Sequence, residues 1–274
     1  MENKAIEVRD VQVGYEEHIV IPKLSLSIPK GKITIIIGPN GCGKSTLLKT
    51  IGRILSPQQG DVLLNGESIR RQSPRHVAQR MAVLPQSPVV PAGLMVRELV
   101  AYGRFPYQSP MGGLNQQDLE IVQWAMQSTG TLELADRMVT ELSGGQRQRA
   151  WIAMALAQKT DILVLDEPTT YLDMANQLEV LNLLRHLNHA TGVTVLIVMH
   201  ELNNAIKFAD HIVGMKMGHV VFTGEPAEVI TQANLRELYD INATLEMGPD
   251  GRHPICIDYE LCEEKRKDAD TAAS

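Results

Sequence analysis

Two short stretches of the sequence place glycines, a lysine and carboxylates at spacings that suit phosphate chemistry. The first reads GPNGCGKST at residues 38–46, after an apolar run that ends at Ile37 and before helix-forming residues from Leu47. In the pattern G-x-x-x-x-G-K-[ST], backbone N–H groups curl around phosphate oxygens, and the dipole of the following helix attracts their charge. Lys44 would serve the β- and γ-phosphates, and Ser45 would offer a hydroxyl to Mg²⁺. We therefore predict a phosphate loop made of Gly38, Pro39, Asn40, Gly41, Cys42, Gly43, Lys44, Ser45 and Thr46.

The second stretch is an apolar run that delivers two adjacent carboxylates. ILVLDEP at residues 162–168 reads as a buried strand, and ligands bind beyond the carboxyl ends of strands in open parallel sheets. Asp166 would hold Mg²⁺ through its water shell. Glu167 points elsewhere and could orient or deprotonate a water for in-line attack on the γ-phosphate. Together the two stretches predict Mg²⁺-dependent cleavage of a nucleoside triphosphate.

Each stretch also has a simpler structural interpretation. The phosphate loop could be an ordinary glycine-rich turn, and the two carboxylates could be solvated residues that end a strand. Their occurrence in one chain favours the chemical interpretation. The glycines do not match G-x-G-x-x-G, which disfavours a nicotinamide cofactor.

The surrounding pattern predicts the elements that position these residues. Residues 5–30 alternate apolar and polar positions, as short strands do. Helical spacing dominates residues 94–158, and strands are expected again at 162–165 and 193–199, separated by a helix through 178–187. A β–α–β succession of this kind predicts an α/β fold with a parallel sheet flanked by helices.

Composition excludes several classes of protein. The 274 residues carry a net charge of −6, which argues against a protein that coats nucleic acid. The apolar runs are far shorter than the roughly 20 residues that span a bilayer. The N-terminal stretch MENKAIEVRD has no signal-peptide apolar region, and three cysteines form no even disulfide framework. We therefore expect a chain that stays in the cytosol and binds no nucleic acid.

A third stretch, LSGGQRQR at residues 142–149, begins a helix with a serine and two glycines. Ser143 is a candidate N-cap, and the glycines would leave the first N–H groups of the helix uncovered for an anion. With this stretch, the chain resembles the nucleotide-binding subunits of ATP-binding cassette (ABC) transporters, whose defining signature is LSGGQ. The resemblance covers about residues 5–242. It implies that the ATP of a second, head-to-tail copy is bound by Leu142, Ser143, Gly144, Gly145 and Gln146.

The same resemblance implies roles for single residues. Tyr15 matches the aromatic residue that stacks on adenine, and Gln86 matches the loop glutamine that touches Mg²⁺ and senses the membrane partner. Asp173 lies in the loop between the two ATP sites, and His200 matches the switch histidine that contacts the γ-phosphate. The implied catalytic residues are Lys44, Glu167 and His200, and the implied Mg²⁺ ligands are Ser45, Gln86 and Asp166. Tyr15, Gln86 and His200 could each also be an ordinary strand or loop residue.

The resemblance further implies a domain plan. It predicts a P-loop NTPase fold with a RecA-like parallel-sheet core, an N-terminal antiparallel β subdomain and an inserted α-helical subdomain. The ABC ATPase domain would span residues 1–242, with the helical subdomain at about 87–160. Residues 243–262 would form a β-hairpin extension, and 263–274 a flexible tail. A groove around residues 87–107 would receive a coupling helix of the permease.

Longer stretches narrow the type of transporter. LDEPTTYLDMANQLEVL and VRELVAYGRFPY are similar to the cassettes that power iron-siderophore uptake, with haem and cobalamin importers as alternatives. Glu201 stands where this group commonly has Asp. A non-transport ABC ATPase is disfavoured because residues 60–140 contain no long coiled-coil insertion. The implied partners are a second copy, a membrane permease dimer and, indirectly, an extracytoplasmic substrate-binding protein, with this chain peripheral on the cytoplasmic face of the membrane.

Overall fold

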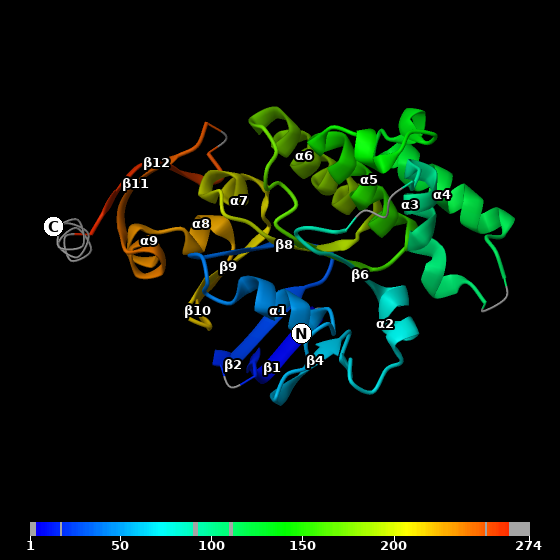
Figure 1. Cartoon of the computed structure of the whole chain (residues 1–274). Coiled ribbons are helices and arrows are strands. Elements are labelled where there is room, and N and C mark those ends of the chain that lie inside the picture. Colours follow the sequence, from blue (N-terminus) through cyan, green and yellow to red (C-terminus); the bar gives the residue numbers. More distant parts are fainter. Residues whose placement is uncertain (1–3, 17, 90–92, 110–111, 250, 263–274) are drawn as a thin grey trace. The chain divides into compact units, whose positions relative to one another are not determined.

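The structure is a computed structural model that describes residues 4–16, 18–89, 93–109, 112–249 and 251–262. The chain forms two compact units. The first combines the N-terminal part, up to Asn65, with the C-terminal part from Val198, and the second spans Gly66–Ile197. Figure 1 follows the chain through the helices and strands of both units.

The first unit contains an antiparallel sheet built from the N-terminal alternating sequence. Strand β1 (Lys4–Tyr15) pairs with β2 (His18–Pro29) on one side and with β4 (Gln59–Leu64) on the other. The apolar positions of β1, such as Val8, Val11 and Val13, are buried, while most positions between them are partly or fully exposed. The alternation seen in the sequence therefore corresponds to one covered and one solvated face.

The same unit holds the strand that leads into the phosphate loop. Every residue of β3 (Ile33–Ile37) is buried, and β3 runs parallel to β9 (His211–Lys216), on which β10 (His219–Gly224) lies antiparallel. Burial of a whole strand is typical of a strand covered on both faces. The phosphate loop then leads into helix α1 (Lys44–Ile51).

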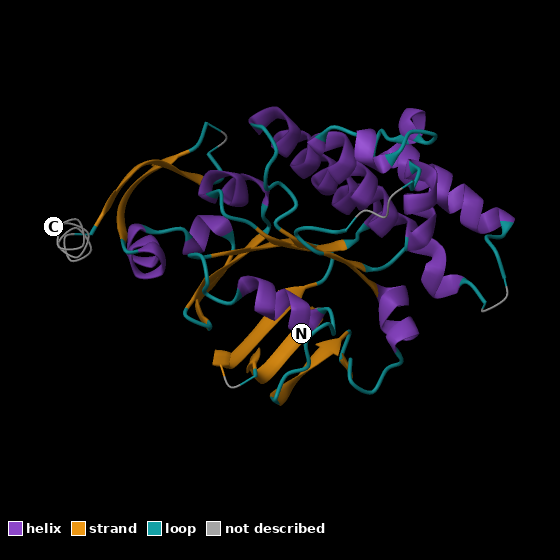
Figure 2. Cartoon of the chain, viewed as in Figure 1, coloured by secondary structure: helices purple, strands orange, loops and turns teal. Residues whose placement is uncertain are grey.

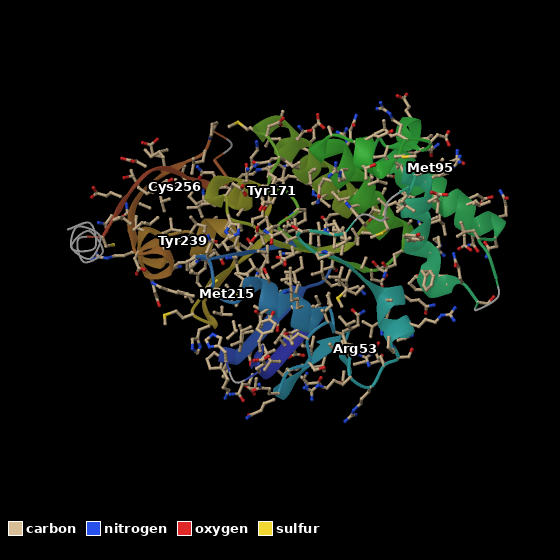
Figure 3. All side chains as sticks on the ribbon, viewed as in Figure 1. Arg53, Met95, Tyr171, Met215, Tyr239 and Cys256 are labelled. Carbon is tan, nitrogen blue, oxygen red and sulfur yellow. The ribbon has the colours of Figure 1, made fainter. Side chains whose placement is uncertain are left out.

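The C-terminal part of the first unit consists of short helices and a hairpin. Helices α7 (Leu202–Phe208), α8 (Pro226–Val229) and α9 (Gln232–Tyr239) precede strands β11 (Ile241–Met247) and β12 (Pro254–Leu261), which pair antiparallel. The Asn203 side chain of α7 donates to the Cys256 carbonyl and accepts from its N–H, both at 2.9 Å. These two bonds attach β12 to α7, and Figure 3 marks Cys256 on that strand.

The second unit supplies the strand that ends in the two carboxylates. Strand β7 (Ile162–Asp166) is buried at every residue and runs parallel to β6 (Met81–Leu84). Strand β8 (Thr194–Val198) is the neighbour of β7 on its other side. Strand β5 (Glu67–Ser68) and helix α2 (Pro74–Arg80) precede β6. Helix α6 (Met174–Thr191) connects β7 to β8, which gives the predicted β–α–β unit.

The remaining helices of the second unit form a bundle, which Figures 1 and 2 show around α5. Helices α3 (Val96–Ala101) and α4 (Gln116–Ser128) both pack on α5 (Gly144–Ala157), and α5 packs on α6. The bundle also contains the 3₁₀ turns η1 (Tyr102–Tyr107), η2 (Leu132–Leu134) and η3 (Val139–Glu141). The helical block predicted at residues 94–158 therefore consists of several short helices.

A buried ion pair ties this bundle together. Arg104 of η1 donates from Nε to Asp118 Oδ1 at 2.8 Å and from Nη1 to the Ala157 carbonyl, also at 2.8 Å. Asp118 also accepts from the Asn115 N–H, closing a capping box at the start of α4. One arginine thus joins the start of α4 to the end of α5. Removing either charged partner would cost about 3–5 kcal/mol, because the other charge would stay buried alone.

The predicted fold class is confirmed. The elements comprise parallel strands with helices, an N-terminal antiparallel sheet and a helical block inserted between β6 and β7. The proposed domain boundaries remain a prediction, and residues 263–274, predicted as a tail, lie outside the described residues.

Candidate nucleotide-binding site

The phosphate loop wraps around the ammonium group of its own lysine. Lys44 Nζ donates to the carbonyls of Gly38 (2.8 Å) and Pro39 (2.9 Å) and lies 3.8 Å from Cys42 Sγ. The lysine side chain is buried, so its charged ammonium group lies inside the loop. Ser45 and Thr46 follow it in the first turn of α1. The residues expected to bind phosphate are thus assembled by one continuous segment.

A close backbone approach explains the first glycine of the loop. A Cβ at Gly38 would lie 2.0 Å from the Met215 carbonyl oxygen of β9, and Gly38 has φ +150°. Figure 3 marks Met215 on that strand. Burial raises the pKa of the Cys42 thiol, with the positive charge of Lys44 opposing the shift. A thiol held in its neutral form is a weak nucleophile, which agrees with a loop that uses backbone groups.

Tyr15 and His200 belong to the same unit as the phosphate loop. The Tyr15 ring, at the end of β1, is half-exposed, and the ammonium of Lys49 on α1 lies 5.9 Å from its centre. His200 is exposed, and the residue before it, Met199, donates its N–H to the carbonyl of Ile36 in β3 at 3.1 Å. The chain therefore reaches His200 directly beside the strand that leads into the phosphate loop.

In the second unit, the two carboxylates at the end of β7 have different surroundings. Asp166 is buried, whereas Glu167 is half-buried. Glu167 has φ +50°, a left-handed conformation that costs a non-glycine residue about 1–2 kcal/mol. Backbone strain of this kind gathers at functional sites, where surrounding contacts maintain it. The strain turns Glu167 away from the direction that a regular strand would give it.

The Glu167 carboxylate accepts hydrogen bonds from two segments. Gln86 Nε2, in the loop after β6, donates to Glu167 Oε2 at 2.5 Å, and Thr170 Oγ1 donates to the same oxygen at 3.0 Å. The sequence motifs mark Gln86 and Glu167 separately and do not show that the two side chains meet. No motif marks Thr170, so its hydroxyl could not be predicted as a donor to the carboxylate three residues earlier.

The signature helix begins with a complete cap. Ser143 Oγ accepts from the Gln146 N–H at 3.3 Å, and Gln146 Oε1 accepts from the Ser143 N–H at 3.1 Å. This reciprocal capping box satisfies two backbone donors. Leu142, just before the cap, is buried. Ser143 is thus the N-cap residue that the sequence suggested.

The two signature glycines have different surroundings. A Cβ at Gly145 would lie 2.2 Å from Asn176 Oδ1 of α6, whereas a Cβ at Gly144 would meet only Leu172 Cδ2 at 3.5 Å. Gly145 therefore permits close packing of α5 on α6. Only Gly144 is exposed where an incoming anion could use the space. The sequence pattern alone predicted the same role for both glycines.

The loop before α6 carries Asp173 and an exposed aromatic. Asp173 is the N-cap of α6: it accepts from the Asn176 N–H (2.8 Å) and side-chain amide (2.9 Å), and these bonds hold the pKa of its carboxyl below the usual range. Tyr171 is 92% exposed with φ +65°, and Figure 3 marks it on this loop. The capping fixes where the loop ends and α6 begins.

The predicted metal ligands have the chemistry of a Mg²⁺ site in which phosphate oxygens also coordinate the ion. Ser45, Gln86 and Asp166 offer a hydroxyl, an amide and a carboxylate, the oxygen ligands that Mg²⁺ prefers, and this ion usually keeps waters and substrate phosphates as well. Within the described residues, no three His, Cys, Asp or Glu side chains gather as a protein-only metal site. Such a gathering is not required of a site in which the nucleotide supplies part of the ligands.

A family model for ABC transporters matches residues 21–170. The chain belongs to the ABC transporter family. Sequence relatives and solved structures of this family extend the similarity beyond those residues. The chain is 48% identical to the iron(3+)-hydroxamate import ATP-binding protein FhuC of Bacillus subtilis (strain 168), over 96% of this chain and 98% of that protein.

Solved structures agree with this membership. A chain from an ABC transporter described as of metal-chelate type, in an inward-facing conformation, superposes with a TM-score of 0.80 at 29% identity, covering 93% of this chain and 98% of that chain. A dimeric bacterial ABC transporter cassette, MJ0796, gives a TM-score of 0.71 at 28% identity, covering 80% and 98%. ABC cassettes thus form dimers, and this chain is an ATP-binding ATPase of their family.

Membrane-spanning helices are not part of the described structure. Among the described residues, no helix combines the length and the apolar character needed to cross a bilayer. Residues 90–92, inside the predicted permease groove, lie outside the described residues.

Proposed function

We propose that this chain is the ATP-hydrolysing subunit of an ABC importer for iron-siderophore complexes. The observation that carries the proposal is the 48% identity to an iron(3+)-hydroxamate import ATP-binding protein over nearly the whole of both chains. The fold match to a transporter described as of metal-chelate type supports it. ATP binding and hydrolysis in this subunit would drive a separate membrane permease between its access states.

Within that function, we infer the following residue roles. The phosphate loop binds the triphosphate through its backbone N–H groups, and Lys44 neutralises charge on the β- and γ-phosphates. Bound Mg²⁺, held by Ser45, Gln86 and Asp166, would offset the charge that develops on the phosphate oxygens. Tyr15 stacks on adenine. The remaining step is activation of the attacking water, which falls to a side chain of this chain.

Glu167 is the group that we assign to that water. Its carboxylate orients the water and accepts its proton as the oxygen attacks the γ-phosphorus and the bond to the β–γ bridging oxygen breaks. His200 contacts the γ-phosphate in this proposal. The left-handed backbone and paired donors at Glu167 support the assignment, because a general base needs a fixed aim.

We further infer that the working form is a head-to-tail dimer. The signature residues of one copy would bind the ATP held by the phosphate loop of the other, and Asp173 would lie between the two sites. ATP favours closure because it adds contacts that only the closed dimer satisfies. The dimeric cassette MJ0796 supports this arrangement. The permease and an extracytoplasmic substrate-binding protein complete the proposed system, with this chain on the cytoplasmic face of the membrane.

The second candidate cargo is haem or cobalamin, since the same sequence features resemble importers of those compounds. Uptake of radiolabelled ferric hydroxamate, haem and cobalamin by cells with and without this chain decides between them. We expect the deletion to abolish ferric-hydroxamate uptake, and plasmid-borne wild type but not Glu167→Gln to restore it. Equal iron-chelate uptake in both strains would refute the proposal that the cargo is an iron-siderophore complex.

A further inference from the structure

The Glu167 carboxylate is held by one local donor and one donor from another segment. Thr170 Oγ1 and Gln86 Nε2 both donate to Oε2, at 3.0 and 2.5 Å. A glutamate has three rotatable side-chain bonds, and a general base must lie in hydrogen-bond reach, about 2.6–3.2 Å between heavy atoms, of the group whose proton it takes. The donors that fix Oε2 therefore decide how often the carboxylate is correctly aimed.

Thr170 has the geometry of a permanent donor. Its N–H also donates to the Glu167 carbonyl at 3.3 Å, which closes a turn over residues 167–170. A second turn, closed by the Leu172 N–H and the Thr169 carbonyl at 3.2 Å, overlaps the first. Thr170 is half-buried and its φ is not among the left-handed ones. A β-branched side chain has few χ1 choices. Both ends of this bond are thus fixed by the same short stretch of chain.

Gln86 has the geometry of an exchangeable donor. It is exposed, it lies in the loop that follows β6, and its amide sits at the end of a long side chain. Its partner Glu167 is 81 positions away in the sequence. Motion of the loop would change this bond while leaving the turn at Thr170 intact. The two donors therefore differ in the kind of support that they give.

We propose that Thr170 is a positioning residue for ATP hydrolysis, whose hydroxyl holds Oε2 of Glu167 and aims the carboxylate at the attacking water. The inference rests on the proposed role of Glu167 as the general base. Thr170 does not touch the nucleotide in this account. Its contribution is to the rate of the chemical step and not to ATP affinity, since misplacing a reacting group by about 1 Å can cost up to about 100-fold in rate.

The test uses four substitutions in the purified full-length chain. Thr170→Val removes the hydroxyl and keeps the shape, and Thr170→Ser keeps the hydroxyl. Thr191→Val is the matched control, because Thr191 Oγ1 donates to the Leu187 carbonyl at the end of α6 and has no proposed role. Glu167→Gln removes the base. Steady-state hydrolysis is measured against ATP concentration with Mg²⁺ present.

We expect Thr170→Val to lower kcat about tenfold, with KM for ATP within about twofold of wild type. Thr170→Ser should restore most of the lost kcat, and Thr191→Val should match wild type. The double variant Glu167→Gln with Thr170→Val should lose no more activity than Glu167→Gln alone, since residues that act as one unit are not additive. Thr170→Ala replaces Thr170→Val if the valine variant does not fold.

Three results would overturn the inference: wild-type kcat in Thr170→Val, a serine variant as slow as the valine variant, or a loss that appears in KM alone. The outcome for the proposed function is read separately. Wild-type turnover by Glu167→Gln would refute the assignment of Glu167 as the general base and, with it, the proposed mechanism. An inactive Glu167→Gln beside a fully active Thr170→Val would leave that mechanism standing and remove only the role of Thr170.

Discussion

Two helix N-termini of this protein, those of α1 and α5, are both expected to meet phosphate, yet they are built differently. Helix α1 has a glycine N-cap, Gly43, with φ +104° and no side-chain cap. Helix α5 has a serine N-cap whose capping box with Gln146 is closed within the chain. The first helix start leaves its donors for a ligand, whereas the second already satisfies two of its own.

The two helix starts differ in whether a ligand is needed to satisfy their backbone amides. The uncapped start of α1 leaves backbone amides for an acceptor outside the helix to satisfy, such as water or a phosphate oxygen. The capped start of α5 needs no ligand to be stable. It can therefore remain folded and exposed until it binds the nucleotide of another copy. We therefore expect substitutions at α1 to affect ATP binding, and substitutions at α5 to affect hydrolysis or folding.

The largest expected effect follows from removing the charge at α1. Lys44→Ala should lower turnover by about 100-fold or more and weaken ATP binding, because Lys44 is the positively charged side chain of the phosphate loop. ATP binding by calorimetry and hydrolysis by phosphate release are the measurements. Normal ATP affinity in this variant would contradict the role assigned to the phosphate loop.

A large side chain at the start of α5 should lower hydrolysis and leave ATP binding intact. Ser143→Arg should lower hydrolysis about 100-fold, since it fills the space through which the γ-phosphate of a partner would approach. ATP binding to the phosphate loop should remain within about twofold of wild type. Thermal unfolding shows whether the variant is folded, and unchanged hydrolysis would exclude a role for the signature in the active site.

The two signature glycines should differ in their effect on the stability of the protein. Gly145→Ala should destabilise the protein by about 1–3 kcal/mol, because its Cβ would overlap Asn176. Gly144→Ala should be neutral or stabilising, by up to about 1 kcal/mol, since it meets only an ordinary contact. Chemical unfolding of both variants measures the difference. Adding Asn176→Ala to Gly145→Ala should recover part of the loss, and equal effects of the two alanines would contradict the packing argument.

The smallest effect concerns the cap itself. Ser143→Ala removes the acceptor for the Gln146 N–H and should cost about 1 kcal/mol of unfolding free energy. Ser143→Gly should cost only a few tenths of a kcal/mol by the same measure. If both variants were as stable as wild type, the capping box would contribute nothing to the stability of α5.

Local sequence patterns predicted much of this protein. The phosphate loop, the strand that ends in Asp166 and the Ser143 cap depend on residues within a few positions of one another, so their chemistry is visible in the sequence. The α/β fold followed from alternating strand and helix patterns, and the structure confirms it. The family resemblance is confirmed by the family match. The individual site roles remain predictions.

Contacts between distant segments could not be predicted in the same way. The bond from Gln86 to Glu167 and the approach of Gly145 to Asn176 join residues 81 and 31 positions apart, and only the packed unit brings them together. The left-handed backbone of Glu167 is also set by the surrounding structure, because glutamate has no preference for that conformation. These features locate the site more finely than the motifs do.

The central claim is that the α1 end of one copy and the α5 end of another form one active site. Mixing Lys44→Ala with Ser143→Arg tests it, because a mixed dimer contains one phosphate loop and one signature that are both intact and that face each other. Half of the dimers in an equal mixture would be mixed, each with one of two sites restored, so ATP hydrolysis should rise to about a quarter of wild type. Hydrolysis no greater than the average of the two separate variants would contradict the claim.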